Sequence, residues 1–162
     1  IRHLKADVLK QLPPKLRQRV TLEPSKLEVR KMKDVQRQIA SLCSAGKADL
    51  DENCLQDPRL LPAIMQTFKS TAEAKMHCVA QYVEHLVSTG TKFLLFAHHH
   101  VMLDALEAKL QALQAGYVRI DGKTAQSGRA ELVDRFQTQE TVLVALLSIT
   151  ACGQGLTLTS AR

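Results

Sequence analysis

Apolar and polar positions in the second half of the chain follow two alternating patterns. The apolar runs KFLLFA at 92–97 and VLVALLS at 142–148, with the shorter YVRID at 117–121 between them, are typical of buried strands. The intervening segments 101–116 and 127–137 space their apolar residues as helices do. Strands that alternate with helices of this length indicate βαβ units, so we predict an α/β fold with a parallel sheet and flanking helices.

The first 25 residues are less regular. Residues 1–12 space apolar side chains as one helical stripe, which Pro13 and Pro14 stop. Residues 17–25 have the β-branched, alternating pattern of a strand that ends at Pro24. We therefore predict a short helix and a strand in this part of the chain.

Two longer helices are predicted next. Apolar spacing favours a helix over 26–45, with Gly46 as its stop, and another over 71–90, with Thr71 as a candidate N-cap and Gly90 at its end. Between them, residues 47–62 are acidic and interrupted twice by proline. This stretch is predicted to be a linker or a mobile insertion.

The carboxyl ends of parallel strands are where such sheets bind their ligands. The predicted strands are followed by three polar or small-residue stretches, at 98–100, 121–124 and 148–155. Because parallel strands end at the same edge of a sheet, we expect these three stretches to meet along one rim.

The last of them, SITACGQG, contains Gly153 and Gly155 directly after a buried run. A P-loop needs Lys followed by Ser or Thr after its second glycine, and here Leu156 and Thr157 follow. A dinucleotide-binding turn needs a third glycine at the position of Leu158. The sequence matches neither fingerprint. The turn can therefore offer N–H groups of its own main chain to a phosphate, but it supplies no charge.

The segment IDGKTAQSGR at 120–129 combines hydroxyl groups and cations where a strand gives way to a helix. Lys123, Thr124, Ser127 and Arg129 form a candidate phosphate-contact set. A capped helix with surface charges explains the same residues without a ligand. Asp121 is a candidate general base, but the sequence shows no nucleophile or partner acid for it.

The triplet His98, His99 and His100 invites interpretation as a metal site. Adjacent side chains on extended backbone point to opposite sides, so at most two of them share an ion, and no other cluster completes a zinc site. The cysteines show no CxxC spacing; they are Cys43, Cys54, Cys78 and Cys152. We expect reduced thiols and no bound metal.

Positive charge is concentrated at the N-terminal end. Residues 1–37 hold eleven Lys and Arg against four Asp and Glu, whereas residues 38–162 hold eleven against twelve. A cationic strip beside a near-neutral body favours a polyanion as partner, and a solvated, Lys-rich helix face explains the same charge pattern equally well.

The 162 residues are expected to form one compact domain with an appendage. The absence of a long apolar run or signal-peptide pattern predicts a soluble, intracellular protein.

Four stretches, taken in order, resemble a known family. They are IRHLKADVLKQLPPK at 1–15, KFLLFAHHHVMLDAL at 92–106, YVRIDGKTAQSGRAELVDRFQ at 117–137 and VALLSITACGQGLTLTSA at 144–161. The chain resembles the Swi/Snf-type ATP-dependent DNA translocases of helicase superfamily two. Within that family it is similar to the annealing helicases that rewind DNA at stalled forks.

The resemblance implies an incomplete RecA-like lobe of the P-loop NTPase type, preceded by a helical protrusion. Residues 1–25 are then the tail of the first lobe and the inter-lobe linker. Residues 26–75 form the protrusion, and residues 76–162 form the second, helicase C-terminal lobe, truncated before motif VI.

The resemblance also implies roles for individual residues. FLLFAHH at 93–99 matches motif IV, and SITACGQGLTL at 148–158 matches motif V. The residues expected to contact DNA are His98, Lys123, Thr124, Arg129, Ser148 and Thr150. The residues expected to line the ATP cleft, and to couple the grip on DNA to its closure, are Gly153, Gln154, Gly155, Leu156 and Thr157.

By the same resemblance, ATP and Mg²⁺ are bound mainly by the first lobe, whose P-loop and acidic motif are not in this chain. No residue of the fragment is then catalytic, and Arg162 is not given the role of a motif VI arginine. The fragment alone is expected neither to bind ATP tightly nor to hydrolyse it.

The expected partners are forked or branched double-stranded DNA, the first RecA-like lobe and, through regions outside the fragment, single-strand-binding or clamp proteins, with no membrane. The expected activity is ATP-driven fork rewinding in DNA repair, in the nucleus. The alternatives are a nucleosome-remodelling ATPase of the same family, a small-molecule α/β enzyme, and a non-catalytic module that binds nucleic acid, a partner protein or an acidic membrane through its basic front.

Overall fold

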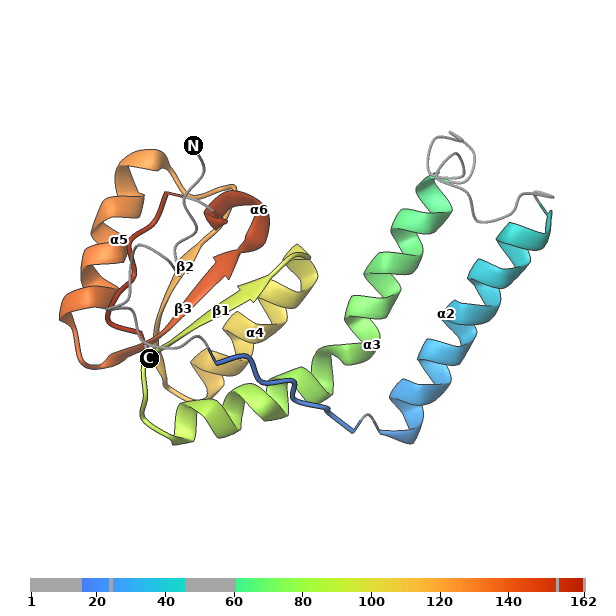
Figure 1. Cartoon of the computed structure of the whole chain (residues 1–162), viewed down its shortest axis with the longest axis horizontal. Coiled ribbons are helices and arrows are strands. Elements are labelled where there is room, and N and C mark those ends of the chain that lie inside the picture. Colours follow the sequence, from blue (N-terminus) through green and yellow to red (C-terminus); the bar gives the residue numbers. More distant parts are fainter. Residues whose placement is uncertain (1–15, 24, 46–60, 154, 162) are drawn as a thin grey trace, which may run out of the picture.

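The computed structural model describes residues 16–23, 25–45, 61–153 and 155–161. Two long helices come first and three strands, each followed by a helix, come after them. In order, the elements are α2 (Lys26–Ala45), α3 (Leu61–Ser88), β1 (Phe93–Ala97), α4 (His100–Ala112), β2 (Gly116–Ile120), α5 (Gln126–Thr138), β3 (Val142–Ser148) and α6 (Ile149–Cys152). The strands form one parallel sheet in the order β1-β3-β2, which confirms the predicted α/β fold (Figure 1).

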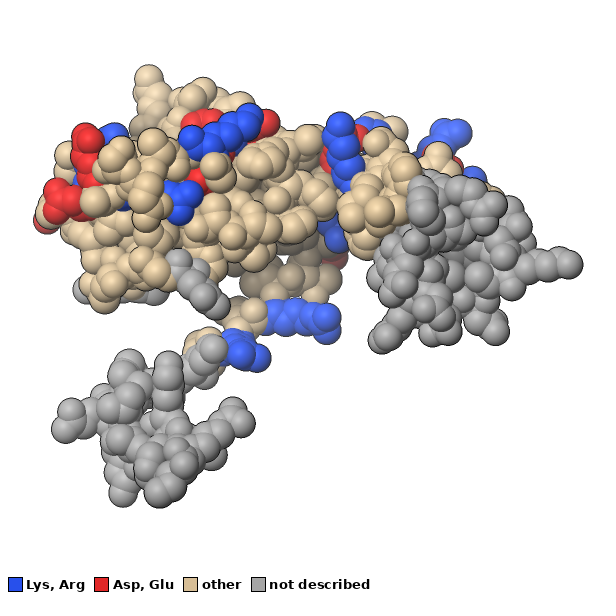
Figure 2. Space-filling view, turned by 90° about the horizontal axis from the view of Figure 1, so that it is seen from above, with Lys and Arg blue, Asp and Glu red and all other residues tan. Residues whose placement is uncertain are grey.

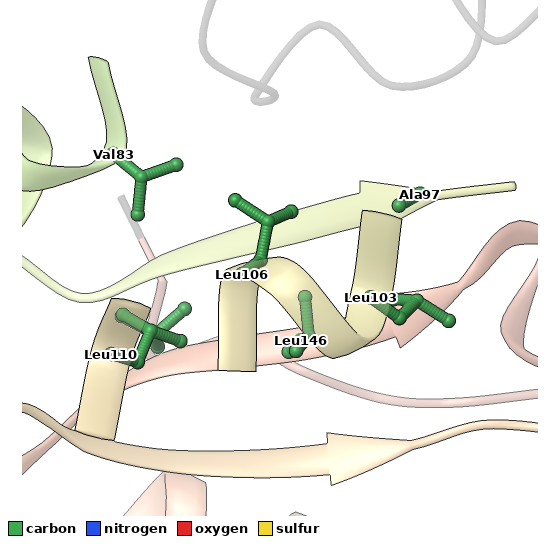
Figure 3. Packing of buried hydrophobic residues seen from close by; sticks show 7 residues of the cluster. Val83, Ala97, Leu103, Leu106, Leu110 and Leu146 are labelled. Atoms are coloured by element: carbon green, nitrogen blue, oxygen red, sulfur yellow. The ribbon is translucent and has the colours of Figure 1, made fainter. Parts of the chain in front are cut away.

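Both faces of the sheet are covered. Helix α4 and the last part of α3 pack on one face, where Val83, Leu106 and Leu146 are almost fully buried (Figure 3). Helix α5 covers the other face through Phe136, which is 0% exposed and packs with Leu147 of β3. Burial on both faces explains why β1 and β3 read as continuous apolar runs.

A close backbone approach fixes the start of β2. Gly116 pairs with Val142, and a Cβ atom at position 116 would lie 2.0 Å from the carbonyl oxygen of Thr141. Only glycine fits there without moving the backbone, and the register of β2 on β3 shifts directly after it.

Helices α2 and α3 form an antiparallel pair beside the lobe (Figure 1). Glu28 anchors this pair. Its Oε2 accepts a hydrogen bond from Ser25 N–H (2.5 Å) while its own N–H donates to Ser25 Oγ (3.3 Å), which is a capping box. Its Oε1 accepts from the N–H of Cys78 in α3 (3.3 Å), so one buried carboxylate ties the start of α2 to the middle of α3.

Helix α3 bends along its length, so that its first part lies beside α2 and its last part beside α4 (Figure 1). The hydroxyl groups of Ser70 and Thr71 donate to carbonyl groups four residues earlier, and the N–H of Cys78 is directed to Glu28. Both arrangements weaken the regular hydrogen bonding of a helix and bend it. The helix is continuous across residues 75 and 76, where the resemblance places a domain boundary.

Several helix and strand predictions are settled by these elements. The helix over 26–45 is confirmed, and α3 ends at Ser88, just before Gly90, whose φ is +67°. Thr71 is not an N-cap, because α3 already begins at Leu61 and the Thr71 hydroxyl bonds to Thr67 O (2.9 Å) within the helix.

The strand predicted over 17–25 is wrong. Residues 16–23 have no regular structure, and Leu16 and Val20 are 89% and 43% exposed. A strand needs a neighbour for its N–H and C=O groups, and the three strands of the described sheet pair only with one another. The helix predicted over 1–12 and most of the linker predicted over 47–62 lie outside the described residues.

Candidate functional site

The three polar stretches that follow the strands meet at one edge of the sheet, as predicted. Ala97 at the end of β1 is the register partner of Ser148 at the end of β3, and Ile120 at the end of β2 is the partner of Leu147. Helices α4, α5 and α6 all begin at this edge, and none has a side-chain N-cap. We call this edge the rim. The N-terminus of a helix carries a positive partial charge, so the rim favours anions.

The turn after β2 is shaped by Asp121 and Thr124. The N–H of Asp121 donates to Thr124 Oγ1 (3.0 Å), and the N–H of Lys123 donates to Asp121 Oδ1 (2.9 Å). These bonds occupy the Thr124 hydroxyl with the turn itself. The Lys123 side chain is exposed and pairs with no residue in the described part of the chain, so its ammonium group is available to a ligand.

Asp121 is held in its charged form by a cation in the strand before it. Arg119 Nη2 lies 2.9 Å from Asp121 Oδ2 and 2.8 Å from Asp104 Oδ1, and Arg119 Nη1 lies 2.5 Å from Glu107 Oε2. Burial alone would raise the pKa of Asp121, but the N–H of Lys123 and the Arg119 guanidinium outweigh it and lower that pKa. The carboxylates likewise outweigh burial and raise the pKa of Arg119.

This network joins β2 to α4 and has a structural role. Asp121 is buried and its two oxygens are occupied by the Arg119 guanidinium, the Lys123 N–H and the Thr124 hydroxyl. An acceptor that is ionised and fully bonded in this way is a poor general base.

Arg129 joins two of the three rim stretches. Its guanidinium donates to the carbonyl oxygens of Asp121 (3.2 Å) and Thr124 (3.3 Å) in the turn after β2, and to that of Ala151 (3.4 Å) in α6 after β3. Cys152 makes a parallel link, because its Sγ donates to Ile120 O (3.2 Å). Arg129 therefore fixes the spacing of the two turns. A contact of Arg129 with phosphate stays a prediction.

The other predicted DNA contacts differ in accessibility. Thr150 and His98 are exposed at the rim, and the His98 ring stands edge-on to His99 at 4.9 Å. Ser148 is only 1% exposed, and its Oγ lies 2.9 Å from Thr150 Oγ1. In this structure Ser148 positions the Thr150 hydroxyl and is shielded from solvent itself.

The glycine-containing turn follows the short helix α6. Gly153 and Gly155 are exposed, and Gly155 has a φ of +82°, which an L side chain adopts only with strain. Leu156 packs against the core on the α5 face, and the Thr157 carbonyl accepts a bond from Gln137 (3.3 Å). The turn is thus anchored to the lobe on one side while its backbone is open on the other; Gln154 lies outside the described residues.

Within the ranges that the structure describes, no group of three His, Cys, Asp or Glu side chains could hold a metal ion. Cys78 and Cys152 are buried free thiols, and burial raises the pKa of the Cys152 thiol. None of the described helices is long and apolar enough to cross a membrane.

The sequence did not single out Arg119, yet it makes more ion pairs than any other cation among the residues described. A signal was present, since Asp104 and Glu107 lie three positions apart on one helix face and a lone arginine stands in an otherwise apolar strand. What the sequence did not show is that this strand and this helix are neighbours.

The parallel sheet with its flanking helices has the fold of a SWI2/SNF2 ATPase C-terminal domain. The chain belongs to the helicase conserved C-terminal domain family, whose model matches residues 74–162. It is 38% identical, over 99% of its length, to the SWI/SNF-related matrix-associated actin-dependent regulator of chromatin subfamily A-like protein 1 of Xenopus tropicalis, of which it covers 16%. It is also 38% identical, over 99% of its length, to the DNA annealing helicase and endonuclease ZRANB3 of Mus musculus, of which it covers 15%.

A solved structure has the same fold. The Sulfolobus solfataricus SWI2/SNF2 ATPase core in complex with dsDNA matches with a TM-score of 0.61 at 15% identity, over 86% of this chain and 32% of that one. These findings confirm the resemblance to the Swi/Snf-type translocases and to their annealing-helicase branch. The chain spans about a sixth of the length of the two curated relatives.

Proposed function

We propose that this chain is the second motor lobe of an ATP-dependent double-stranded-DNA translocase, and that its rim grips the DNA phosphate backbone. The observation that carries the proposal is the rim itself. Arg129 joins the turns after β2 and β3, which places the free Lys123 ammonium group, the Thr150 hydroxyl and the start of α5 at one edge. A cation, a hydroxyl and a helix N-terminus are groups that bind phosphate without reading base sequence.

The relatives support a finer assignment. One is named a DNA annealing helicase, and a structural neighbour of this fold is an ATPase core in complex with dsDNA. Fork rewinding in DNA repair, in the nucleus, is therefore the favoured activity of the whole protein. The other relative is named a regulator of chromatin, which supports nucleosome remodelling as the second candidate.

The nucleotide and its metal ion fit this lobe only in part. Gly153, Gly155 and Thr157 are exposed, so their backbone N–H groups and the Thr157 hydroxyl are offered to the edge of a nucleotide. Asp121, the buried carboxylate at the rim, is committed to Arg119. ATP and Mg²⁺ would thus be held mainly by a first lobe, and ATP supplies the free energy that closes the two lobes. The contribution of this lobe is to bind phosphate and position the DNA.

The experiment measures binding of the chain and its Lys123→Ala variant to a labelled DNA fork over a range of salt concentrations. Loss of one phosphate contact should weaken binding and reduce the slope of log K against log salt by about 1. In a protein that joins this lobe to a first lobe, the same substitution should lower DNA-stimulated ATP hydrolysis.

Lys69→Ala is the matched control, because Lys69 is an exposed lysine on α3, outside the rim. Its affinity and salt slope should stay at the values of the unsubstituted chain. Equal losses in both variants would show that net charge alone governs binding. No loss at Lys123 would remove the rim as the DNA contact.

A further inference from the structure

Helix α2 carries a row of cations that the rim does not explain. Lys26, Arg30, Lys33 and Arg37 follow the spacing i, i+4, i+7 and i+11 and are all exposed. At about 100° per residue they fall within an arc of about 60° on the helix. We call these four residues the basic stripe.

The basic stripe faces away from the rest of the molecule. Glu28 bonds to α3 and Met32 is half-buried, and both lie roughly 130° or more around α2 from the centre of the stripe, at about 100° per residue. Helix α2 packs on α3 with its inner side, so the stripe lies on the side of α2 that is turned from the lobe (Figure 1).

Almost no negative charge balances the stripe. Helix α2 has two acidic residues: Glu28 is buried as the link to α3, and Asp34 pairs with Arg37 at 3.1 Å, with both side chains exposed. Like charges four residues apart destabilise a helix, so this row costs free energy in the isolated chain. On the face of the lobe that Figure 2 shows, by contrast, Lys and Arg lie among Asp and Glu.

We infer that the basic stripe is a second contact surface for the phosphate backbone of nucleic acid, separate from the rim. The stripe is about 16 Å long at 1.5 Å per residue, a length over which B-DNA carries roughly ten phosphate charges. Its residues are long cations without interleaved aromatic groups, so the surface neutralises phosphates and does not stack on bases.

An acidic membrane fits the surface less well. A helix that lies on a membrane inserts an apolar face opposite its cations. In α2 the side opposite the stripe is packed on α3 through Glu28 and Met32. The geometry therefore favours a duplex that touches the outer side of α2 over a lipid surface.

The test compares Arg30→Gln/Lys33→Gln with Arg135→Gln/Lys69→Gln in the full chain. Both pairs remove one exposed arginine and one exposed lysine from helices, and neither pair touches the rim. The stripe pair should reduce the slope of log K against log salt for duplex DNA by about 2, and the control pair by much less. Equal effects of the two pairs would overturn the proposal.

Asp34→Asn provides a test that loss of folding cannot imitate. This substitution releases Arg37 and removes the exposed carboxylate beside the stripe, so DNA should bind more tightly and with a steeper salt slope. Unchanged or weaker binding would count against the stripe.

Two further measurements separate the possible partners and sites. If the stripe pair weakens binding to vesicles of phosphatidylserine and phosphatidylcholine while DNA binding is unchanged, the surface is a membrane contact and the inference is wrong.

Combining the stripe pair with Lys123→Ala separates the two sites. If both sites contact one duplex, the loss in binding free energy of the combined variant is the sum of the two separate losses. If Lys123→Ala alone leaves binding unchanged, the rim is excluded as a DNA contact and the stripe stays in place.

Discussion

The lobe and the helical pair beside it are stabilised by different kinds of contact. In the lobe, from β1 to α6, many large side chains are fully buried; they include Phe136, Leu103, Leu106, Leu110, Ile120 and Leu146. Among the side chains that the structure describes in α2 and the first part of α3, the buried ones are small or polar, namely Glu28, Thr67, Ala72 and Ala74. Three larger apolar side chains there are exposed, namely Leu27, Met65 and Phe68.

This difference indicates that the lobe is the rigid region and that the helical pair is the region whose contacts change more easily. Large side chains that fill a core make the rim rigid, since the turns that carry Lys123 and Thr150 begin at fully packed strands. Among the contacts that the structure describes between α2 and α3, the hydrogen bonds of Glu28 are the most specific. Changes in the pair should therefore alter local contacts while the lobe stays folded.

Two phenylalanines test the comparison most strongly. Phe136 is 0% exposed in the lobe, and Phe68 is 53% exposed on α3. Phe136→Ala should destabilise the chain by about 3–5 kcal/mol, because it leaves a cavity between α5 and the sheet. Phe68→Ala should cost less than about 0.5 kcal/mol, as for other exposed positions. Urea unfolding followed by circular dichroism measures both, and similar losses would mean that the helical pair contributes as much as the lobe.

Two arginines give the next largest contrast. Arg119→Met leaves Asp121, whose side chain is 6% exposed, without its cation. The expected loss is about 2–3 kcal/mol, below the range for a fully buried pair because Arg119 retains 18% exposure. The pair of Arg37 with Asp34 is exposed, so Arg37→Met should change stability by less than about 0.5 kcal/mol. The same unfolding measurement applies, and a loss at Arg119 as small as that at Arg37 would contradict a structural role for the network.

The sequence predicts most of the lobe for a physical reason. Strands covered on both faces and helices covered on one face leave apolar patterns that can be read locally, as in β3 and α4. The rim also follows from the sequence, because three parallel strands place their ends at one edge. The resemblance to the family rests on four stretches of the sequence, and the two most specific ones lie at this edge, around Lys123 and between Ser148 and Thr157.

The remaining features depend on contacts between distant residues. Nothing near Arg119 in the sequence shows that Asp104 and Glu107 will lie beside it, and nothing near Arg129 shows that Ala151 will accept its hydrogen bond. The strand predicted over 17–25 failed for a related reason: β-branched residues favour a strand, but only a neighbouring edge completes one. Local pattern therefore predicted the elements, while the roles of individual side chains required the folded chain.

The smallest expected effect concerns the link between the two helices of the pair, α2 and α3. The N–H of Ser25 holds the pKa of Glu28 below its usual value, with further bonds from the Ser25 side chain and the Cys78 N–H, although burial opposes them. A carboxylate with a lowered pKa stabilises the folded state above its ordinary pKa, and this contribution is lost as the pH falls through the lowered value. The joint between α2 and α3 should thus weaken in acid while the core of the lobe does not.

The amide signal of Cys78 in an NMR pH titration reports this joint directly. It should shift with a midpoint below the ordinary pKa of a glutamate, because its hydrogen-bond acceptor is being protonated. Glu28→Gln retains the acceptor and the cap but cannot ionise, so that shift should disappear with little change in overall stability. Glu84→Gln, on the exposed side of α3 where Glu84 pairs with Lys109, should leave the Cys78 titration intact. A Cys78 signal that titrates equally in all three proteins would mean that Glu28 does not hold α2 to α3, and the contrast between the two regions would then rest on packing alone.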